Sequence, residues 1–72
     1  MWYKFFVAGR LDAERAYFIK EEIAGRFGLG RVVVDRKERY FLIPMEEECR
    51  LPEVVDCIGG CGLEVSGYMG IQ

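Results

Sequence analysis

The sequence predicts a single α+β domain in which one antiparallel sheet carries two helices on one face. Two observations lead to this prediction. Apolar residues alternate or run together in four short segments, which is typical of strands, and recur at three- and four-residue steps in two others, which is typical of helices. In chain order these segments are strand, helix, strand, strand, helix, strand. With 72 residues, the chain has room for one such domain, residues 1–72, and no second folded unit.

Residues 2–8, WYKFFVA, are rich in aromatic and β-branched side chains and predict the first strand. Successive strand residues point to opposite faces, so Tyr3, Phe5 and Val7 share one face and Lys4 lies on the other. Because a lysine avoids an apolar core, we expect the first set to pack against the helices.

The strongest helix signal covers residues 12–28. Its apolar residues fall on one stripe of a helix with 3.6 residues per turn: Ala16, Ile19, Ile23 and Phe27. Asp12 can accept hydrogen bonds from the free N–H groups of the first turn. Gly28 can adopt the left-handed conformation that ends a helix. The segment therefore has a predicted beginning, buried face and end.

Two apolar runs, residues 31–35 and 40–45, flank the charged segment 35–38 and predict an antiparallel hairpin. Pro44 has no N–H to donate to a ladder, so the third strand is expected to end there or to lie at an edge. The acidic run 46–48 is expected to be a solvated turn or a first helical turn.

Pro52 suits the first turn of a second helix that continues to residue 60, with Leu51, Val55 and Ile58 along one side. Gly59 and Gly60 are expected to keep this helix short. Residues 63–71 predict the fourth strand. Strict alternation would place Leu63, Val65, Met69 and Ile71 on one face and Glu64, Ser66 and Tyr68 on the other.

The predicted order of elements resembles that of ferredoxin-like domains, a fold that hosts many functions. In ferredoxin-like regulatory modules such as the ACT domain, the first strand-to-helix loop often contributes to an effector site. In this chain Gly9 and Arg10 precede the positive end of the first helix, next to Asp12. These three residues are the predicted ligand-binding loop for a small anion, a carboxylate or phosphate. The alternative is that Asp12 serves as a helix cap alone.

The sheet face opposite the helices is predicted to carry Trp2, Phe6, Tyr40 and Tyr68. An open apolar face on a small domain is a candidate interface, so we expect a homodimer formed through it. Ferredoxin-like RNA-binding domains instead stack bases on aromatic side chains of this face. Their basic and aromatic strand motif is missing, and a pI of about 5.1 makes a nucleic-acid partner the less favoured alternative.

The chain contains no histidine, which excludes Ser-His and Cys-His nucleophile systems within one copy. An enzyme would have to use carboxylates or thiols, and no pair of these is convincingly placed. Cys49, Cys57 and Cys61 include no C-x-x-C pair, so no metal or other cofactor is expected. We interpret them as small apolar residues in a reducing compartment. A disulfide, or a metal bound with Asp56, is the alternative.

The composition favours a folded protein, because 51% of residues are hydrophobic and 31% charged. No apolar run approaches the length of a membrane span, and we expect a cytoplasmic protein. Asparagine is absent and Glu, Lys and Arg are abundant, which is typical of proteins from hot environments. Residues 1–39 carry a net charge of +3 and residues 40–72 a net charge of −5. This asymmetry favours solubility or self-association. The sequence thus indicates a non-enzymatic interaction or ligand-binding module.

Overall fold

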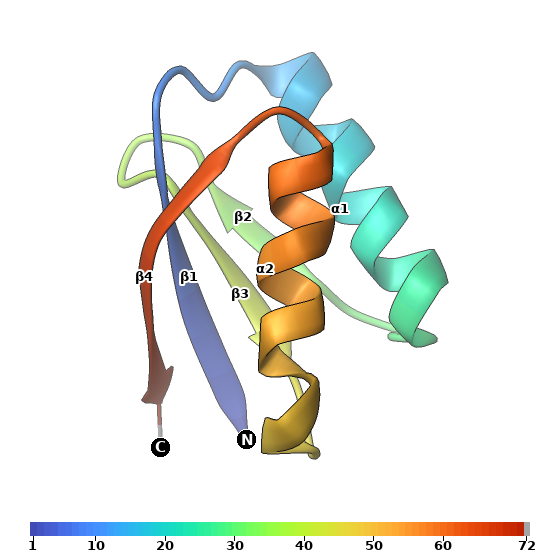
Figure 1. The fold of residues 1–72 in the computed structure, drawn as a ribbon. Helices are drawn as coiled ribbons and strands as arrows, with labels where there is room; N and C mark the ends of the chain where they lie inside the picture. The colour runs from blue at the N-terminus through green and yellow to red at the C-terminus, as the bar shows by residue number, and fades with distance from the viewer. Residues whose placement is uncertain (72) are drawn as a thin grey trace.

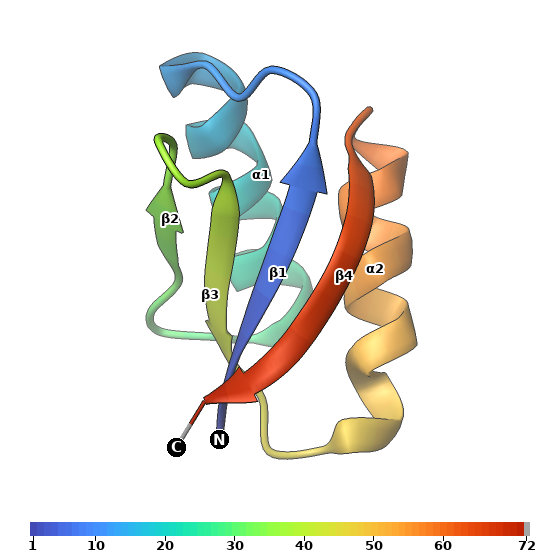
Figure 2. The same ribbon diagram turned by 90° about the vertical axis from the view of Figure 1, so that its left-hand side faces the viewer.

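A computed structural model describes residues 1–71 and confirms the predicted α+β architecture (Figure 1). Two helices lie on one face of a four-stranded sheet, and no helix or strand of the described residues covers the other face (Figure 2). The elements are β1 (Trp2–Ala8), α1 (Ala13–Phe27), β2 (Val33–Asp35), β3 (Tyr40–Pro44), the 3₁₀ turn η1 (Glu48–Arg50), α2 (Leu51–Gly60) and β4 (Glu64–Ile71).

The strands lie in the order β2-β3-β1-β4, and β1 is antiparallel to both of its neighbours. Read from the opposite edge, this is the order β4-β1-β3-β2 of the ferredoxin-like fold. Each helix connects two parallel strands that have one antiparallel strand between them, α1 from β1 to β2 and α2 from β3 to β4. Strand β1 is therefore interior, while β2 and β4 form the edges.

The core lies between the sheet and the helices, and β1 supplies its centre. Tyr3, Phe5 and Val7 are buried as predicted, and Phe5 is fully inaccessible to solvent. Phe41 and Ile43 of β3 lie beside them, because residues paired across an antiparallel ladder point to the same face. No polar or charged residue is buried within residues 1–71. The core is thus held together by apolar packing.

Helix α1 follows the sequence prediction closely. The Asp12 carboxylate accepts a hydrogen bond from the Arg15 N–H at 2.8 Å, which caps the first turn. Gly28 has φ of 64° and donates its N–H to the carbonyl oxygen of Ala24. The four predicted stripe residues are all buried. The helix could be predicted from local sequence because its capping residue, its buried apolar residues and the glycine that ends it all lie within one segment.

The hairpin has the predicted topology, but β2 begins at Val33 rather than at residue 31. The side chain of Asp35 accepts from the Glu38 N–H at 2.9 Å and holds the turn. Arg39 ends the turn with φ of 58°, an unusual conformation for a residue other than glycine. Its carbonyl oxygen accepts from the Val7 N–H, so the turn is tied to β1.

Helix α2 extends from Leu51 to Gly60 and includes both glycines that were expected to shorten it. The predicted apolar side is partly wrong. Val54 and Cys57 are buried together with Leu51 and Ile58, whereas Val55 is half-buried. A helix that lies flat on a sheet needs an apolar face wider than one residue per turn, and a cysteine serves in it as a small apolar group.

The register of β4 overturns part of the sequence prediction. Val65 pairs with Val7 on the core side, but a bulge between Phe6 and Val7 of β1 shifts the pairing by one residue. Because one extra residue in a strand exchanges the faces of all later residues, Tyr68 pairs with Phe5 on the helix side. Met69 and Ile71 consequently lie on the open face instead of the core face.

Gly25 within α1 and Gly28 just after it allow a matched test of these backbone assignments. Alanine at Gly28 must adopt the left-handed conformation and should lower the free energy of unfolding by roughly 1–2 kcal/mol. Alanine at Gly25 lies within the helix with open space around its Cβ, and it should raise the free energy of unfolding by about 0.5–1 kcal/mol. Urea denaturation measures both, and equal signs for the two variants would contradict the assigned helix end.

Tyr3 predicts a specific dependence of stability on pH. Burial, followed by the hydrogen bond that its hydroxyl donates to Glu48 Oε1 at 3.2 Å, raises the pKa of Tyr3 above 10.0. A raised folded-state pKa adds stability that is fully present below pH 10.0 and is lost as the pH rises further. The unfolding free energy of Tyr3→Phe should therefore fall less than that of the wild type between about pH 9 and pH 11. If the unfolding free energies of Tyr3→Phe and the wild type change equally over this pH range, this contribution is ruled out.

Candidate functional site

The open face of the sheet carries apolar side chains outside the core. In the register of the ladders, alternate residues of β1 and β3 and parts of both edge strands point to it. Its apolar members are Trp2, Phe6, Val33, Tyr40, Leu42, Pro44, Met69 and Ile71. Most are half-buried, but Val33 and Met69 are exposed, Met69 by 53%. We call this set the open face.

Contacts within the open face are centred on Tyr40. The rings of Phe6 and Tyr40 meet edge to face with centroids 5.9 Å apart. Lys4 Nζ lies 4.5 Å from the centroid of the Tyr40 ring, a cation–π contact that holds the single cation of the face over an aromatic side chain. Asp35 pairs with Tyr40 from the edge strand β2 and places one carboxylate at the rim. Glu64 of the other edge strand pairs with Ala8, which lies on the same side of β1 as Lys4. The face therefore carries one cation and two carboxylates, both on edge strands.

Three of the four predicted interface residues, Trp2, Phe6 and Tyr40, share the open face. The assignment of Tyr68 to it is wrong. Because of the bulge, Tyr68 lies on the helix side, where its ring centroid is 5.2 Å from that of Phe5.

Sequence reasoning did not place Leu42 and Pro44 on the open face, although both could have been found. Strand β3 alternates strictly, and Phe41 and Ile43 are its buried residues. The residues between them must therefore point outward. Met69 and Ile71 had no such signal, because their face depends on the bulge.

The predicted ligand-binding loop connects β1 to α1. Gly9 has φ of 97°, and its carbonyl oxygen accepts a hydrogen bond from Arg39 Nη1 at 3.3 Å. Arg10 is exposed beside it. The Asp12 carboxylate already bonds the first turn of α1, so a negative group occupies the helix end that an anion would bind. Arg39, far away in sequence, is a second cation at this loop that sequence reasoning missed.

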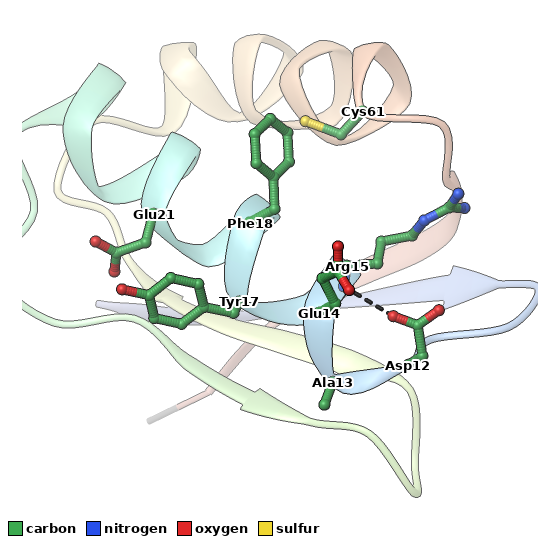
Figure 3. Close-up of a pocket in the computed structure, with 8 residues that line it drawn as sticks. All are labelled: Asp12, Ala13, Glu14, Arg15, Tyr17, Phe18, Glu21 and Cys61. Atoms are coloured by element: carbon green, nitrogen blue, oxygen red, sulfur yellow. Dashed lines mark hydrogen bonds between the residues drawn. The ribbon is translucent and has the colours of Figure 1, made fainter.

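A groove of about 880 Å³ lies between the first half of α1 and the end of α2 (Figure 3). It is lined by Asp12, Ala13, Glu14, Arg15, Tyr17, Phe18, Glu21 and Cys61. Phe18 is 55% exposed, and its ring points toward Cys61, as Figure 3 shows. Asp12 is thus the one member of the predicted ligand loop that lines the groove. Nothing in the sequence predicted this groove, because its two walls come from distant segments.

The three cysteines are free and occupy different environments. Cys49 is exposed in η1, Cys57 is buried in α2, and Cys61 is half-buried at the end of that helix. Within residues 1–71, no three Cys, Asp or Glu side chains gather closely enough to hold a metal ion. Burial raises the pKa of the Cys57 thiol, against the opposing effect of Arg26, and the neighbouring Cys61 and Glu22 raise it further.

No protein-family model, curated protein or solved structure matches this chain. Among the described helices, none is long and apolar enough to cross a membrane. The chain's own geometry therefore carries the functional argument.

Substitution of Asp12 separates the capping hydrogen bond of its side chain from the effect of its charge on stability. Asp12→Ala should lower the free energy of unfolding by about 1 kcal/mol, because the Arg15 N–H loses its partner. Asp12→Ser keeps an acceptor at the cap and should remain close to the wild type. Thermal or urea unfolding measures both variants. A serine variant as unstable as the alanine variant would show that the charge itself, and not the cap, matters.

Proposed function

We propose that this protein is a small interaction module, without catalytic activity, that acts as a homodimer formed through the open face. The observation that carries the proposal is the continuity of apolar side chains across all four strands of that face. In antiparallel sheets with one solvated face, the outward positions are normally polar. Here the outward positions of the central strands β1 and β3 hold Trp2, Phe6, Tyr40, Leu42 and Pro44, with Lys4 as the one charged residue.

The size of the open face suits a moderate affinity. Four strands about 4.8 Å apart and seven residues that each rise about 3.4 Å give a footprint of roughly 19 by 24 Å. This area of about 460 Å² is smaller than the roughly 800 Å² that a standard interface covers on each partner, so the open face belongs with the small, weak interfaces. We expect a dissociation constant of the order of micromolar.

A second copy is the occupant that the charges of the face favour. Lys4 lies at its centre and Asp35 at the β2 rim, so two copies related by a two-fold axis can place each cation against the partner's carboxylate. A strand of RNA would need several cations on this surface, and Lys4 is the one basic residue of β1 and β3. An apolar protein surface therefore fits better than a nucleic acid.

A small anion at the β1–α1 loop is the second part of the proposal, as in a regulatory module. The observation that favours it is the convergence of Arg39 and Arg10 beside Gly9. Three free thiols suit a reducing compartment, and we propose a cytoplasmic location for this reason.

The dimer is tested by sedimentation or light scattering over a range of concentrations. Trp2→Glu and Phe6→Glu each place an unpaired charge in the proposed interface and should weaken association by about a hundredfold or more. The matched control is Tyr17→Glu, which removes a 64% exposed aromatic residue from the helical layer and should leave the mass unchanged.

A wild type that stays monomeric at millimolar concentration would contradict the dimer. Glutamate variants that dimerise like the wild type would also contradict the dimer. If the monomer instead bound RNA with an affinity that falls steeply with salt, the RNA alternative would replace the proposal.

A further inference from the structure

The end of α2 brings two thiols together in the helical layer, away from the open face. Cys57 is 3% exposed and faces the core, and Cys61 follows the last residue of the helix. Residues four apart on a helix lie on the same side of it, one turn from each other. Cys57 belongs to the buried core, and Cys61 packs against that core. They therefore form an adjacent pair, independent of the proposed dimer.

A disulfide between Cys57 and Cys61 requires the last turn of α2 to tighten, and the sequence around Cys61 allows this change. Four residues of helix separate two Cα atoms by about 6 Å, which a disulfide tolerates. The Cβ atoms, however, are about 5–6 Å apart in a regular helix and must approach to about 4 Å. Gly59, Gly60 and Gly62 surround Cys61, and Gly62 already has φ of 94°. This glycine-rich last turn can tighten without side-chain clashes.

We propose that Cys61 is a site of oxidation by hydroperoxides and that Cys57 converts the oxidised residue to an intrahelical disulfide. In the first step the Cys61 thiolate attacks one peroxide oxygen, the O–O bond breaks, and Cys61 sulfenic acid and water or an alcohol form. In the second step the Cys57 sulfur displaces the sulfenic oxygen, which leaves as water with the Cys57 proton. The two thiols are oxidised by two electrons, and the peroxide is reduced by two.

The surroundings assign different roles to the two residues. Cys61 lines the groove between the helices, where a small peroxide can reach it. Cys57 is buried, and burial raises the pKa of its thiol. Cys57 therefore suits the second step, in which its sulfur attacks the neighbouring Cys61.

Cys49 is excluded from the pair by its position. It lies in η1, at the opposite end of α2, so that roughly 18 Å of helix separates it from Cys61. A bond between them would require loss of the helix. Cys49 thus serves as an internal control.

Peptide mass measurement tests the proposal directly. Cleavage after Arg39 and Arg50 separates Cys49, in peptide 40–50, from the pair, in peptide 51–72. After treatment of the reduced protein with equimolar hydrogen peroxide and blocking of remaining thiols, peptide 51–72 should be unblocked and lighter by two hydrogen atoms. Peptide 40–50 should be blocked and unchanged. Reduction with dithiothreitol should restore two blockable thiols.

Three variants complete the experiment. Cys49→Ser should form the disulfide at the wild-type rate, and Cys61→Ser should not form it. Gly60→Ala fits the available space but stiffens the last turn, and should slow ring closure by about fivefold. The proposal is overturned if peptide 51–72 gains oxygen without losing hydrogen, if it becomes linked to peptide 40–50, or if Cys61→Ser loses thiols as fast as the wild type.

Discussion

The structure depends on the alternation of side chains along β1. This strand lies between β3 and β4, so each of its residues points either into the single core or onto the open face. Phe5, fully buried, is the centre of one side, and Phe6, its neighbour in sequence, is the centre of the other. Two helices can cover one face of a four-stranded sheet, and residues 1–71 contain no further helix or strand that covers the second. The open face is a consequence of that geometric constraint.

Small size explains why an uncovered apolar face matters for stability as well as for function. A domain of about 70 residues buries a smaller fraction of its surface than a larger one and has little stability to spare. Association through an apolar face buries surface that the monomer alone leaves exposed. A partner that binds the folded state also stabilises that state. In the proposed dimer, a second copy buries the open face.

Much of the fold could be predicted because its signals are local. Helix α1 carries its cap at Asp12, its stripe and its stop at Gly28 within one segment. The β4 face assignment could not be predicted, because the bulge depends on how β4 meets β1 and leaves no mark in the alternation of residues 63–71. The face of α2 was misjudged at Val55 for a similar reason, since its width depends on the sheet beneath it.

The same distinction applies to the candidate sites. Trp2, Phe6 and Tyr40 could be assigned to one face because they belong to strands without a bulge between them, whereas Tyr68 lies beyond the bulge. The approach of Arg39 to Gly9 and of Phe18 to Cys61 joins segments far apart in sequence. Such contacts follow from the tertiary fold and could not be predicted from patterns of residues in the sequence.

The most direct measurement of the central claim uses the single tryptophan of the chain, Trp2, which lies on the open face. Its fluorescence emission and its quenching by iodide would be followed as the protein is diluted. If the open face is buried between two copies, dilution through the dissociation range will shift the emission to longer wavelength and increase quenching together with the loss of dimer mass. An emission spectrum and a quenching constant that stay the same while the dimer dissociates would contradict the account, because the interface would then lie elsewhere.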